Sequence, residues 1–247
     1  MNGFVKMVDV HTHILPAIDD GAADEKEACQ MLKALASQRV TTVCLTPHYY
    51  HHKESITAFL TRRAEAFQKI EEYASQCELT IFLACEAHLT EDLLNEPDLS
   101  MLCINKTRFL LLEAPRDWLF SAKEQFLLER LISRFGILPI LAHVERYPPL
   151  LKSDSLLSNL LEMGCRMQIN LSSLSEGSFL IRRRLIRCLS EDTIHFVGTD
   201  CHNMTRRAPE YTRHIDLIEK KLGRKFVEQL QINAKRMLNP SAMKVQL

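Results

Sequence analysis

Short apolar runs of strand length alternate with longer amphipathic segments along almost the whole chain. Strands that alternate with helices in this way run parallel and form a sheet that helices cover. The pattern predicts an α/β fold with about seven strands. Seven rather than eight favours a distorted or incompletely closed TIM-like barrel, although an open sheet fits the same pattern. The predicted strands cover residues 4–10, 40–45, 79–85, 108–112, 137–142, 166–170 and 194–198.

The segments between these strands repeat apolar residues at helical spacing. Asp24 is placed to cap the first helix, and Gly136 stands where the C-terminal cap of a later helix belongs. The predicted helices cover residues 24–38, 55–74, 121–135, 154–163, 179–189, 209–222 and 225–237.

Composition limits the class of protein. A chain of 247 residues, 46% of them hydrophobic and 25% charged, fits one globular domain over residues 1–247. A formal net charge of zero does not favour nucleic-acid binding, and no apolar run reaches the roughly eighteen residues of a membrane-spanning helix. The eight cysteines are scattered without a CxxC pair, and no secretory signal is visible. We therefore expect a cytoplasmic protein with reduced thiols, and the sequence leaves its oligomeric state open.

Residue types that bind metals stand at the carboxyl end of nearly every predicted strand. In a parallel barrel these ends converge on one face, where such folds place their active sites. His11 and His13 lie two residues apart and would share one face of a strand, and Asp200 and His202 repeat this spacing. An ordinary strand end with half-exposed histidines would explain the first pair, but not the whole series. The nine candidate ligands are His11, His13, Asp20, His48, Glu86, Glu113, His143, Asp200 and His202.

This donor set of imidazoles and carboxylates indicates the chemistry of the site. Nine ligands are too many for one ion and suit three, and a set that needs no thiolate favours manganese, iron or zinc. Three divalent ions would exceed the four carboxylates and one hydroxide by about one positive charge. The predicted site should therefore attract an anion such as a phosphoryl group.

Arginines follow two of these positions. Arg146 lies three residues beyond His143, and Arg206 and Arg207 follow His202. A guanidinium at a strand end can hold phosphate oxygens in a bidentate fork, whereas a surface ion pair is the alternative for each arginine. We predict hydrolysis of a phosphate monoester, in which a metal-activated hydroxide attacks phosphorus while Arg146 binds the phosphate. The general acid is left open between His48 and a water on the metal.

The motifs that carry these residues resemble the polymerase and histidinol phosphatase (PHP) superfamily. Within it they are similar to the bacterial metal-dependent protein-tyrosine phosphatases that regulate capsular polysaccharide, over residues 7 to about 233. Two departures concern the arginines. Val144 replaces a proline of the family, and RRAPE replaces GRPP, which leaves open whether Arg206 or Arg207 contacts phosphate. The motifs are HTHILPAIDDGA, TPHYY, the glutamates of ACEAH and LLLEAP, AHVERY and GTDCHNMTRR.

The resemblance implies a distorted barrel, Arg146 as the catalytic arginine, and two to three ions per chain, with manganese preferred over iron or zinc. It also implies a phosphotyrosine substrate, on the tail of a bacterial tyrosine kinase that controls capsule or exopolysaccharide synthesis. By position, the resemblance divides the ligands into three sets, which are His11, His13, Glu86 and Asp200 for the first ion, Glu86, Glu113 and His143 for the second, and Asp20, His48 and His202 for the third.

Other functions compete with this interpretation. A small-molecule phosphatase such as histidinol-phosphate phosphatase would share the metal chemistry, and a non-catalytic regulatory module could bind a kinase without it. Metal-dependent amidohydrolases also begin with HxH, but they normally add a bridging lysine and have fewer acids. Cys201 and Arg207 match the C-x5-R spacing of cysteine-dependent tyrosine phosphatases, yet CHNMTRRA has no glycine for a phosphate loop.

Four residues outside the ligand series could also serve the site. Tyr49, Tyr50 and Trp118 could form a wall beside a substrate ring, although ordinary packing explains them equally well. Asp19 fits a role in shaping the turn or orienting a ligand rather than binding a metal.

Overall fold

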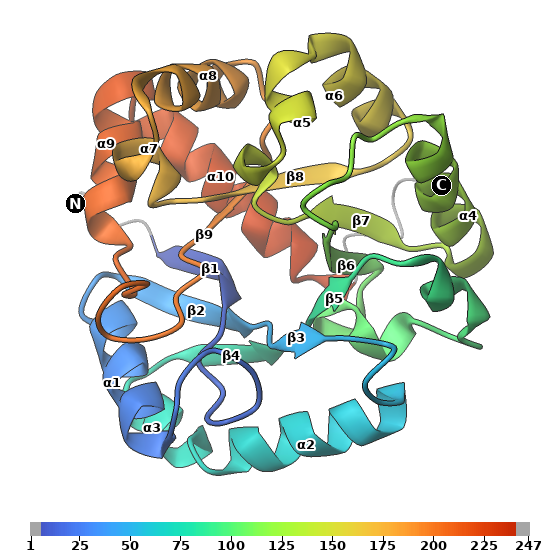
Figure 1. The fold of residues 1–247 in the computed structure, drawn as a ribbon. Helices are drawn as coiled ribbons and strands as arrows, with labels where there is room; N and C mark the ends of the chain where they lie inside the picture. The colour runs from blue at the N-terminus through green and yellow to red at the C-terminus, as the bar shows by residue number, and fades with distance from the viewer. Residues whose placement is uncertain (1–5, 241–247) are drawn as a thin grey trace.

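Parallel strands occupy the middle of the structure and helices surround them (Figure 1). The computed structural model describes residues 6–240. The strands are β1 (Met7–Thr12), β2 (Val40–Leu45), β3 (His48–Tyr49), β4 (Thr80–Leu83), β5 (Glu86–His88), β6 (Phe109–Glu113), β7 (Leu138–Leu141), β8 (Arg166–Asn170) and β9 (Phe196–Gly198). The α-helices are α1 (Glu25–Ala36), α2 (Ile56–Gln68), α3 (Glu71–Gln76), α4 (Ala122–Phe135), α5 (Pro148–Lys152), α6 (Asp154–Glu162), α7 (Ser173–Glu176), α8 (Phe179–Ser190), α9 (Thr212–Leu222) and α10 (Arg224–Met237).

The strands form a curled parallel sheet in two sections, with the orders β1-β2-β4 and β3-β5-β6-β7-β8-β9. β3 pairs with β5 just beyond the place where β2 pairs with β4, so the expected strands 40–45 and 79–85 are each followed by a short second strand that was not expected. Pro47 lacks the N–H that would continue the first. After β4, at the break before β5, the Ala84 carbonyl accepts a hydrogen bond from Arg63 Nη1 (2.7 Å). The described residues therefore contain nine strands where about seven were expected.

The first strand also meets the segment that follows the last one. Thr12 forms an isolated parallel bridge with Cys201. The amide of Asp200 donates to the His11 carbonyl (2.8 Å), and the amide of His13 donates to the Cys201 carbonyl (2.9 Å). These bonds place the end of β1 beside the segment that follows β9, so the candidate ligands of these two segments lie in one region.

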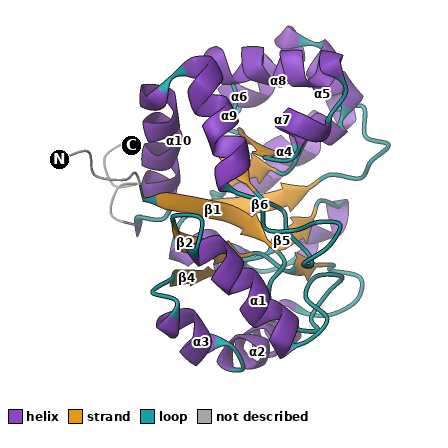
Figure 2. Ribbon diagram, turned by 90° about the vertical axis from the view of Figure 1, so that its left-hand side faces the viewer, coloured by secondary structure: helices purple, strands orange, loops and turns teal. Residues whose placement is uncertain are grey.

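Apolar side chains form two separate cores. The larger lies between the sheet and the surrounding helices. The smaller lies inside the curl of the sheet and includes Val8, Val10, Leu111 and Ile140, with Met237 of α10 against it. Figure 2 shows α10 beside the ends at which β1 begins, and Gln231 Oε1 of this helix accepts from the Val8 amide (2.7 Å). The amino ends of the strands are thus covered, and the opposite ends are left for the site.

Helix ends follow the predicted caps, and one predicted helix is broken. Asp24 caps α1 by accepting from the Glu27 amide, and Gly136 ends α4 with a left-handed φ of 62°. The stretch 55–74 forms α2 and α3, because the buried Ile70 leaves helical geometry between them (φ −120°, ψ −3°). No helix within residues 6–240 is long and apolar enough to cross a membrane.

Two further boundaries differ from the prediction. The first strand runs to Thr12 rather than ending at residue 10, and residues 4 and 5 of the predicted strand lie outside the described part. The helix expected from residue 209 begins at Thr212, because the amides of Tyr211 and Thr212 both donate to the Gln38 side chain (2.7 and 3.1 Å). The other predicted strands and helices agree with the structure to within a few residues.

Candidate metal centre

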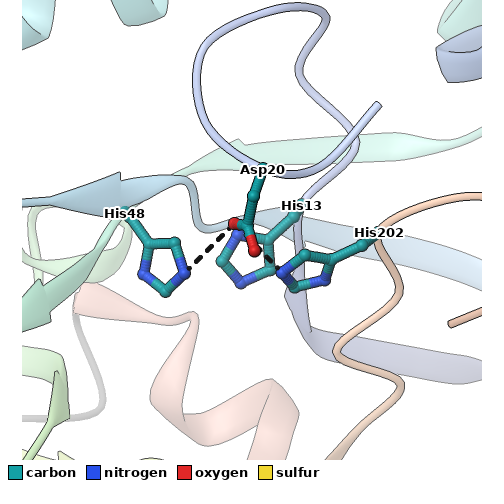
Figure 3. Close-up of side chains that lie close together, drawn as sticks. All are labelled: His13, Asp20, His48 and His202. Atoms are coloured by element: carbon teal, nitrogen blue, oxygen red, sulfur yellow. Dashed lines mark ion pairs between the residues drawn. The ribbon is translucent and has the colours of Figure 1, made fainter. Parts of the chain in front are cut away.

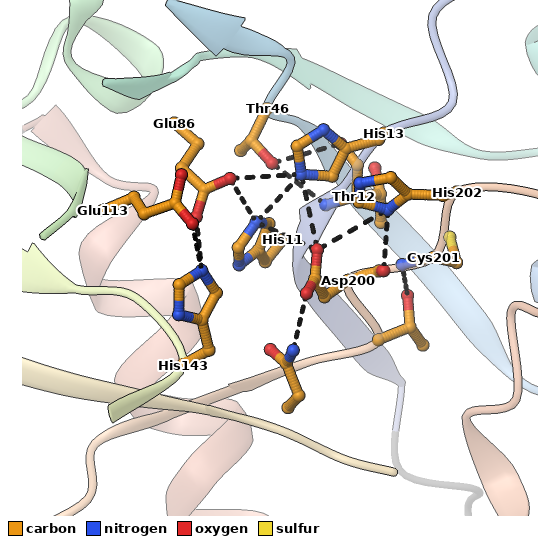
Figure 4. A network of polar contacts seen from close by, with 12 residues as sticks. His11, Thr12, His13, Thr46, Glu86, Glu113, His143, Asp200, Cys201 and His202 are labelled. Carbon is orange, nitrogen blue, oxygen red and sulfur yellow. Dashed lines mark hydrogen bonds and ion pairs between the residues drawn. The ribbon is translucent and has the colours of Figure 1, made fainter. Parts of the chain in front are cut away.

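The nine candidate ligands converge at the carboxyl ends of the strands, where each contacts at least one other. Figure 4 shows seven of them, and Figure 3 shows the other two, Asp20 and His48. His11 Nε2 and His13 Nε2 lie 3.1 Å apart at the end of β1. Glu86 Oε2 is 3.2 and 3.3 Å from these two nitrogens, and Asp200 Oδ1 is 3.5 and 3.4 Å from them. All four side chains are buried. Four electron-pair donors that face one buried point match the first predicted ligand set.

Glu86 extends from this first group to a second. Its other oxygen, Oε1, lies 2.9 Å from His143 Nε2, which is also 3.3 Å from Glu113 Oε1. His48 Nδ1 approaches the same pair of carboxylates, at 3.1 Å from Glu86 and 3.7 Å from Glu113. Glu86 therefore offers one oxygen to each group, which is the geometry of a bridging carboxylate.

A third group lies at the mouth of the site (Figure 3). Asp20 Oδ1 stands 3.4 Å from His48 Nε2 and 3.4 Å from His202 Nε2. His13 joins these three closely enough for all four to surround one ion. The Asp20 side chain is 64% exposed, whereas His202 is buried. This group therefore connects the buried ligands to solvent.

Hydrogen bonds orient three of the imidazoles toward the cluster. In each of them Nδ1 faces an oxygen, so Nδ1 carries a proton, and the neutral ring presents the lone pair of Nε2 to the other ligands. Metal-binding histidines are held in this way in proteins, and the donor set therefore fits divalent ions. The three pairs are His11 Nδ1 with Gln168 Oε1 (3.2 Å), His13 Nδ1 with Asp19 Oδ2 (2.8 Å) and His202 Nδ1 with the Asp200 carbonyl (3.0 Å).

The buried carboxylates stay charged because of the rings around them. Burial alone would raise the pKa of Glu86 and of Asp200, but the facing imidazole of His11 and its neighbours hold both values well below the usual range. Burial would lower the pKa of His143, yet contacts with Glu113 and Glu86 raise it to about 9. Proton and metal thus compete for the same nitrogens, as in other metal sites.

Two arginines meet one oxygen of Asp200. Asp200 Oδ2 lies 2.8 Å from Arg146 Nη2 and 2.6 Å from Arg207 Nη2. Both guanidinium groups border a cavity of about 270 Å³ next to the ligands, and Arg206 lines the same cavity with an exposed side chain. The structure therefore places Arg146 and Arg207, but not the exposed Arg206, in contact with a candidate ligand.

The backbone is strained at two of the ligands. His143 (φ 34°) and Asp200 (φ 53°) adopt the left-handed conformation that residues with a side chain avoid. Each such residue costs about 1–3 kcal/mol and persists where the surrounding structure over-determines it. Gly198 lies two residues before Asp200, and only glycine fits there, because a Cβ would stand 2.7 Å from the Cβ of His11. The glycine at position 198 and the strained backbone of His143 and Asp200 thus help to position these ligands.

Some residues of the site escaped the sequence analysis. Gln168 and Asn170 lie two apart on β8, both buried, and Asn170 Nδ2 donates to Asp200 Oδ2 (2.6 Å). Asp9 Oδ1 and Oδ2 accept from the amide and hydroxyl of Thr199 (3.0 and 2.6 Å), and burial raises the pKa of Asp9 to about 6. For Gln168 and Asn170 a signal was available in the sequence, since two polar residues two apart at a predicted strand end repeat the spacing of His11 and His13.

The structure also places the cysteine and the three aromatic residues considered above. Cys201 is buried, and burial raises the pKa of its thiol well above the usual value, which disfavours a thiolate nucleophile. Tyr49 is buried against Phe59, and Trp118 packs against Phe120. Of the three aromatic residues considered, Tyr50 alone contacts a ligand ring, that of His48, at 5.4 Å between ring centroids.

Imidazoles and carboxylates gathered at the strand ends of a curled parallel sheet form a site that can hold divalent ions for hydrolysis. The chain belongs to the family described as "Capsular polysaccharide synthesis, CpsB/CapC", whose sequence model matches residues 7–239. This agrees with the resemblance found in its motifs.

Named relatives and a solved structure lie in the same family. The chain is 30% identical to "Tyrosine-protein phosphatase YwqE" of Bacillus subtilis, over 94% of this chain and 91% of the relative. It is 29% identical to "Tyrosine-protein phosphatase CpsB" of Streptococcus pneumoniae, over 94% and 98%. A solved structure described under "YwqE from Bacillus subtilis and CpsB from Streptococcus pneumoniae, unique metal-dependent tyrosine phosphatases" superposes with a TM-score of 0.78 at 27% identity, covering 94% of both chains. A dihydropyrimidinase from Brevibacillus agri, at 12% identity and a TM-score of 0.60, covers 95% of this chain and 71% of its own, and shares the fold alone.

Proposed function

We propose that the protein is a metal-dependent protein-tyrosine phosphatase. The observation that carries this proposal is the convergence of nine metal-ligating side chains beside two arginines at one end of the sheet. Two relatives of the chain are named tyrosine-protein phosphatases, which supports the same activity.

The proposed ligand sets follow the three groups of the structure. His11, His13, Glu86 and Asp200 would hold one ion, Glu86, Glu113 and His143 a second, and Asp20, His48 and His202 a third. We propose manganese, with iron or zinc as alternatives, because imidazole and carboxylate donors suit these metals. When bound, such ions supply Lewis acidity for the transfer of a phosphoryl group to water.

The residues of the chain would bind and orient the substrate. Arg146 and Arg207, which share one oxygen of Asp200, can turn their remaining N–H groups to phosphate oxygens. His48 is only partly buried, and with its Nε2 facing Asp20 in the third ion set, its Nδ1, 3.1 Å from Glu86, is the nitrogen left to hold a proton. A phenolate, whose conjugate acid has a pKa of about 10, needs less help from a general acid than an alkoxide does.

The proposed substrate is phosphotyrosine on the tail of a bacterial tyrosine kinase that controls capsule or exopolysaccharide synthesis, in the cytoplasm. The family description supports the link to capsular polysaccharide. We also propose that the chain is one domain. In it, β2 with β3 and β4 with β5 would act as single interrupted strands of a distorted seven-stranded barrel, since their pairings follow one another in register.

Hydrolysis of a phosphotyrosyl peptide, measured with added manganese and again after chelation, tests this proposal. We expect activity that disappears with the chelator and returns with the metal. His143→Ala should lower turnover by orders of magnitude, while His195→Asn, at a histidine outside the ligand cluster, should not. Activity that survives chelation would contradict the metal mechanism. Activity toward histidinol phosphate but not toward the peptide would favour the small-molecule alternative.

A further inference from the structure

β8 carries none of the nine candidate ligands, yet its side chains reach three of them. Gln168 is fully buried, and its Oε1 lies 2.8 Å from the His143 amide and 3.2 Å from His11 Nδ1. Its Nε2 donates to the Ile169 carbonyl (2.7 Å) and to Asn170 Oδ1 (3.2 Å). One side-chain amide thus joins ligands that belong to different strands and to different ion sets.

The orientation of this amide fixes the position of a proton on His11. The backbone N–H of His143 can only donate, so the oxygen of Gln168, not its nitrogen, must face it. The same oxygen also faces His11 Nδ1, which must therefore be the protonated nitrogen of that ring. In the neutral ring the lone pair is therefore on Nε2 of His11, which points at His13, Glu86 and Asp200.

Gln168 also holds a strained part of the backbone. His143 has a φ of 34° and a ψ of 54°, and its amide is bonded to the Gln168 side chain. Without this acceptor the amide would be buried and unpaired, and the left-handed turn that aims His143 at Glu86 and Glu113 would lose a restraint. The neighbouring Asn170 completes the pair by occupying Asp200 Oδ2, which leaves Oδ1 toward the histidines.

We propose that Gln168 is a positioning residue of the metal centre, which sets the tautomer of His11 and the backbone of His143. The inference rests on the proposed metal site, but not on the identity of the substrate. It therefore survives if the protein hydrolyses another phosphate ester. Residues around metal ligands commonly change metal affinity by about 10- to 100-fold when they are replaced.

The first test uses the wild-type protein without metal. Long-range nitrogen–proton NMR correlations of its histidine rings, recorded over a range of pH, report which ring nitrogens carry a proton. We expect Nδ1 of His11 to carry a proton. The signals of His11 are identified as those that are absent from the spectrum of His11→Gln. A His11 ring without a proton on Nδ1 would overturn the proposal without any variant of Gln168.

The second test compares three variants by calorimetric titration with Mn²⁺. Gln168→Leu removes the acceptor, and we expect about 10- to 100-fold weaker binding or the loss of one ion, with a mixed tautomer at His11. Gln168→Glu keeps an oxygen toward both N–H groups, so it should retain the Nδ1–H tautomer and bind more tightly than Gln168→Leu. Gln231→Leu is the matched control, because Gln231 is a buried glutamine that holds the amino end of β1 through Val8. It should leave the tautomer and the Mn²⁺ affinity unchanged.

Two results would overturn the proposal. One is a Gln168→Leu protein that binds Mn²⁺ with wild-type affinity and stoichiometry. The other is an equal loss in Gln168→Leu and Gln231→Leu, which would show that the effect is one of general stability. If Gln168→Leu does not fold, the wild-type tautomer and the Gln168→Glu protein still decide, since loss of the Nδ1–H tautomer in Gln168→Glu would contradict the role of the oxygen.

Discussion

Asp19 Oδ2 lies 2.8 Å from Nδ1 of His13, and the same oxygen accepts the amide of His48 at 3.0 Å. Its other oxygen accepts the amide of Gly21 (2.9 Å). Burial would raise the pKa of Asp19, but the His13 imidazole and these amides lower it, so the carboxylate stays charged. One carboxylate thus orients a ligand of β1, the ligand of β3 and the loop that carries Asp20.

Replacing Asp19 should therefore damage the site without unfolding the protein. We expect Asp19→Ala to lower kcat/KM and the affinity for Mn²⁺ by about 10- to 100-fold, because His13 and His48 lose their common anchor. Phosphotyrosyl peptide hydrolysis at several metal concentrations measures both effects. Asp24→Ala is the control on the same segment, since it removes only the cap of α1, at a cost of about 1 kcal/mol of stability. Equal activity in the two variants would show that Asp19 acts through stability alone.

Replacements of the three arginines near Asp200 should affect kcat/KM to different extents. Arg146→Ala and Arg207→Ala should each reduce kcat/KM by about 10²–10³, the loss typical of a donor that binds developing charge on the reacting group. Arg206→Ala should stay within a few-fold of wild type, because that side chain is exposed. Steady-state kinetics of the three proteins with saturating Mn²⁺ check the order. A loss in Arg206→Ala that exceeds the loss in Arg207→Ala would reverse the assignment.

Cys201 should be dispensable for turnover. Its thiol is buried beside the isolated bridge to Thr12, and burial raises its pKa well above the usual value. Cys201→Ala should keep its activity within about two-fold, while losing roughly 1 kcal/mol of stability from the smaller side chain. Peptide hydrolysis and chemical denaturation measure the two quantities. Loss of all activity in a folded Cys201→Ala protein would revive the cysteine mechanism.

Much of the site was predictable from sequence because its signals are local. His11 and His13 share a face by the geometry of a strand, and the strand ends of a parallel fold meet by topology. The polar pair on β8 marked Gln168 only by its spacing, so its contacts were not predictable, and neither was the choice of Arg207 over Arg206. Gln168 reaches His11 across 157 positions of sequence, and Arg207 reaches Asp200 through the path of one loop.

The fold shows the same division between local and distant causes. The α/β alternation and the caps at Asp24 and Gly136 follow from local patterns. The break between β4 and β5 does not, because an apolar run gives no sign that Arg63 of α2 bonds to the Ala84 carbonyl. Ile70 likewise interrupts a helical pattern, because it is buried and its backbone leaves helical geometry.

Acid should destabilise the protein partly through His195, which lies outside the ligand cluster. Burial, with a smaller contribution from Arg166, lowers the pKa of His195 from 6.5 to about 4. Between these values the unfolded chain binds a proton that the native state does not, so the free energy of unfolding falls as the pH falls from 6.5 to 4. His195→Asn should lose less stability than wild type between about pH 7 and pH 4.5, as measured by urea denaturation. His52→Asn, at an exposed position, should follow the wild-type curve, and identical curves for all three proteins would contradict the assignment.

Tyr50 should recognise the ring of the substrate. It lines a cleft of about 390 Å³ together with Asp20 and His48, so a phosphate ester whose phosphoryl group meets these ligands can lay its ring beside Tyr50. Stacked aromatic pairs contribute about 0.5–1.5 kcal/mol beyond buried area. Tyr50→Ala should therefore raise KM for a phosphotyrosyl peptide several-fold with kcat less affected, and Tyr50→Phe should restore the wild-type value.

Two comparisons separate ring recognition from damage to the metal centre. Trp118→Ala changes an aromatic residue that packs against Phe120 and does not line this cleft, so its KM should stay near the wild-type value. A phosphate ester without a ring should show the same KM with wild type and Tyr50→Ala, because it has nothing to stack. If Tyr50→Ala weakens both kinds of substrate equally, Tyr50 supports His48 rather than selecting the substrate, and the preference for phosphotyrosine must come from elsewhere on the surface.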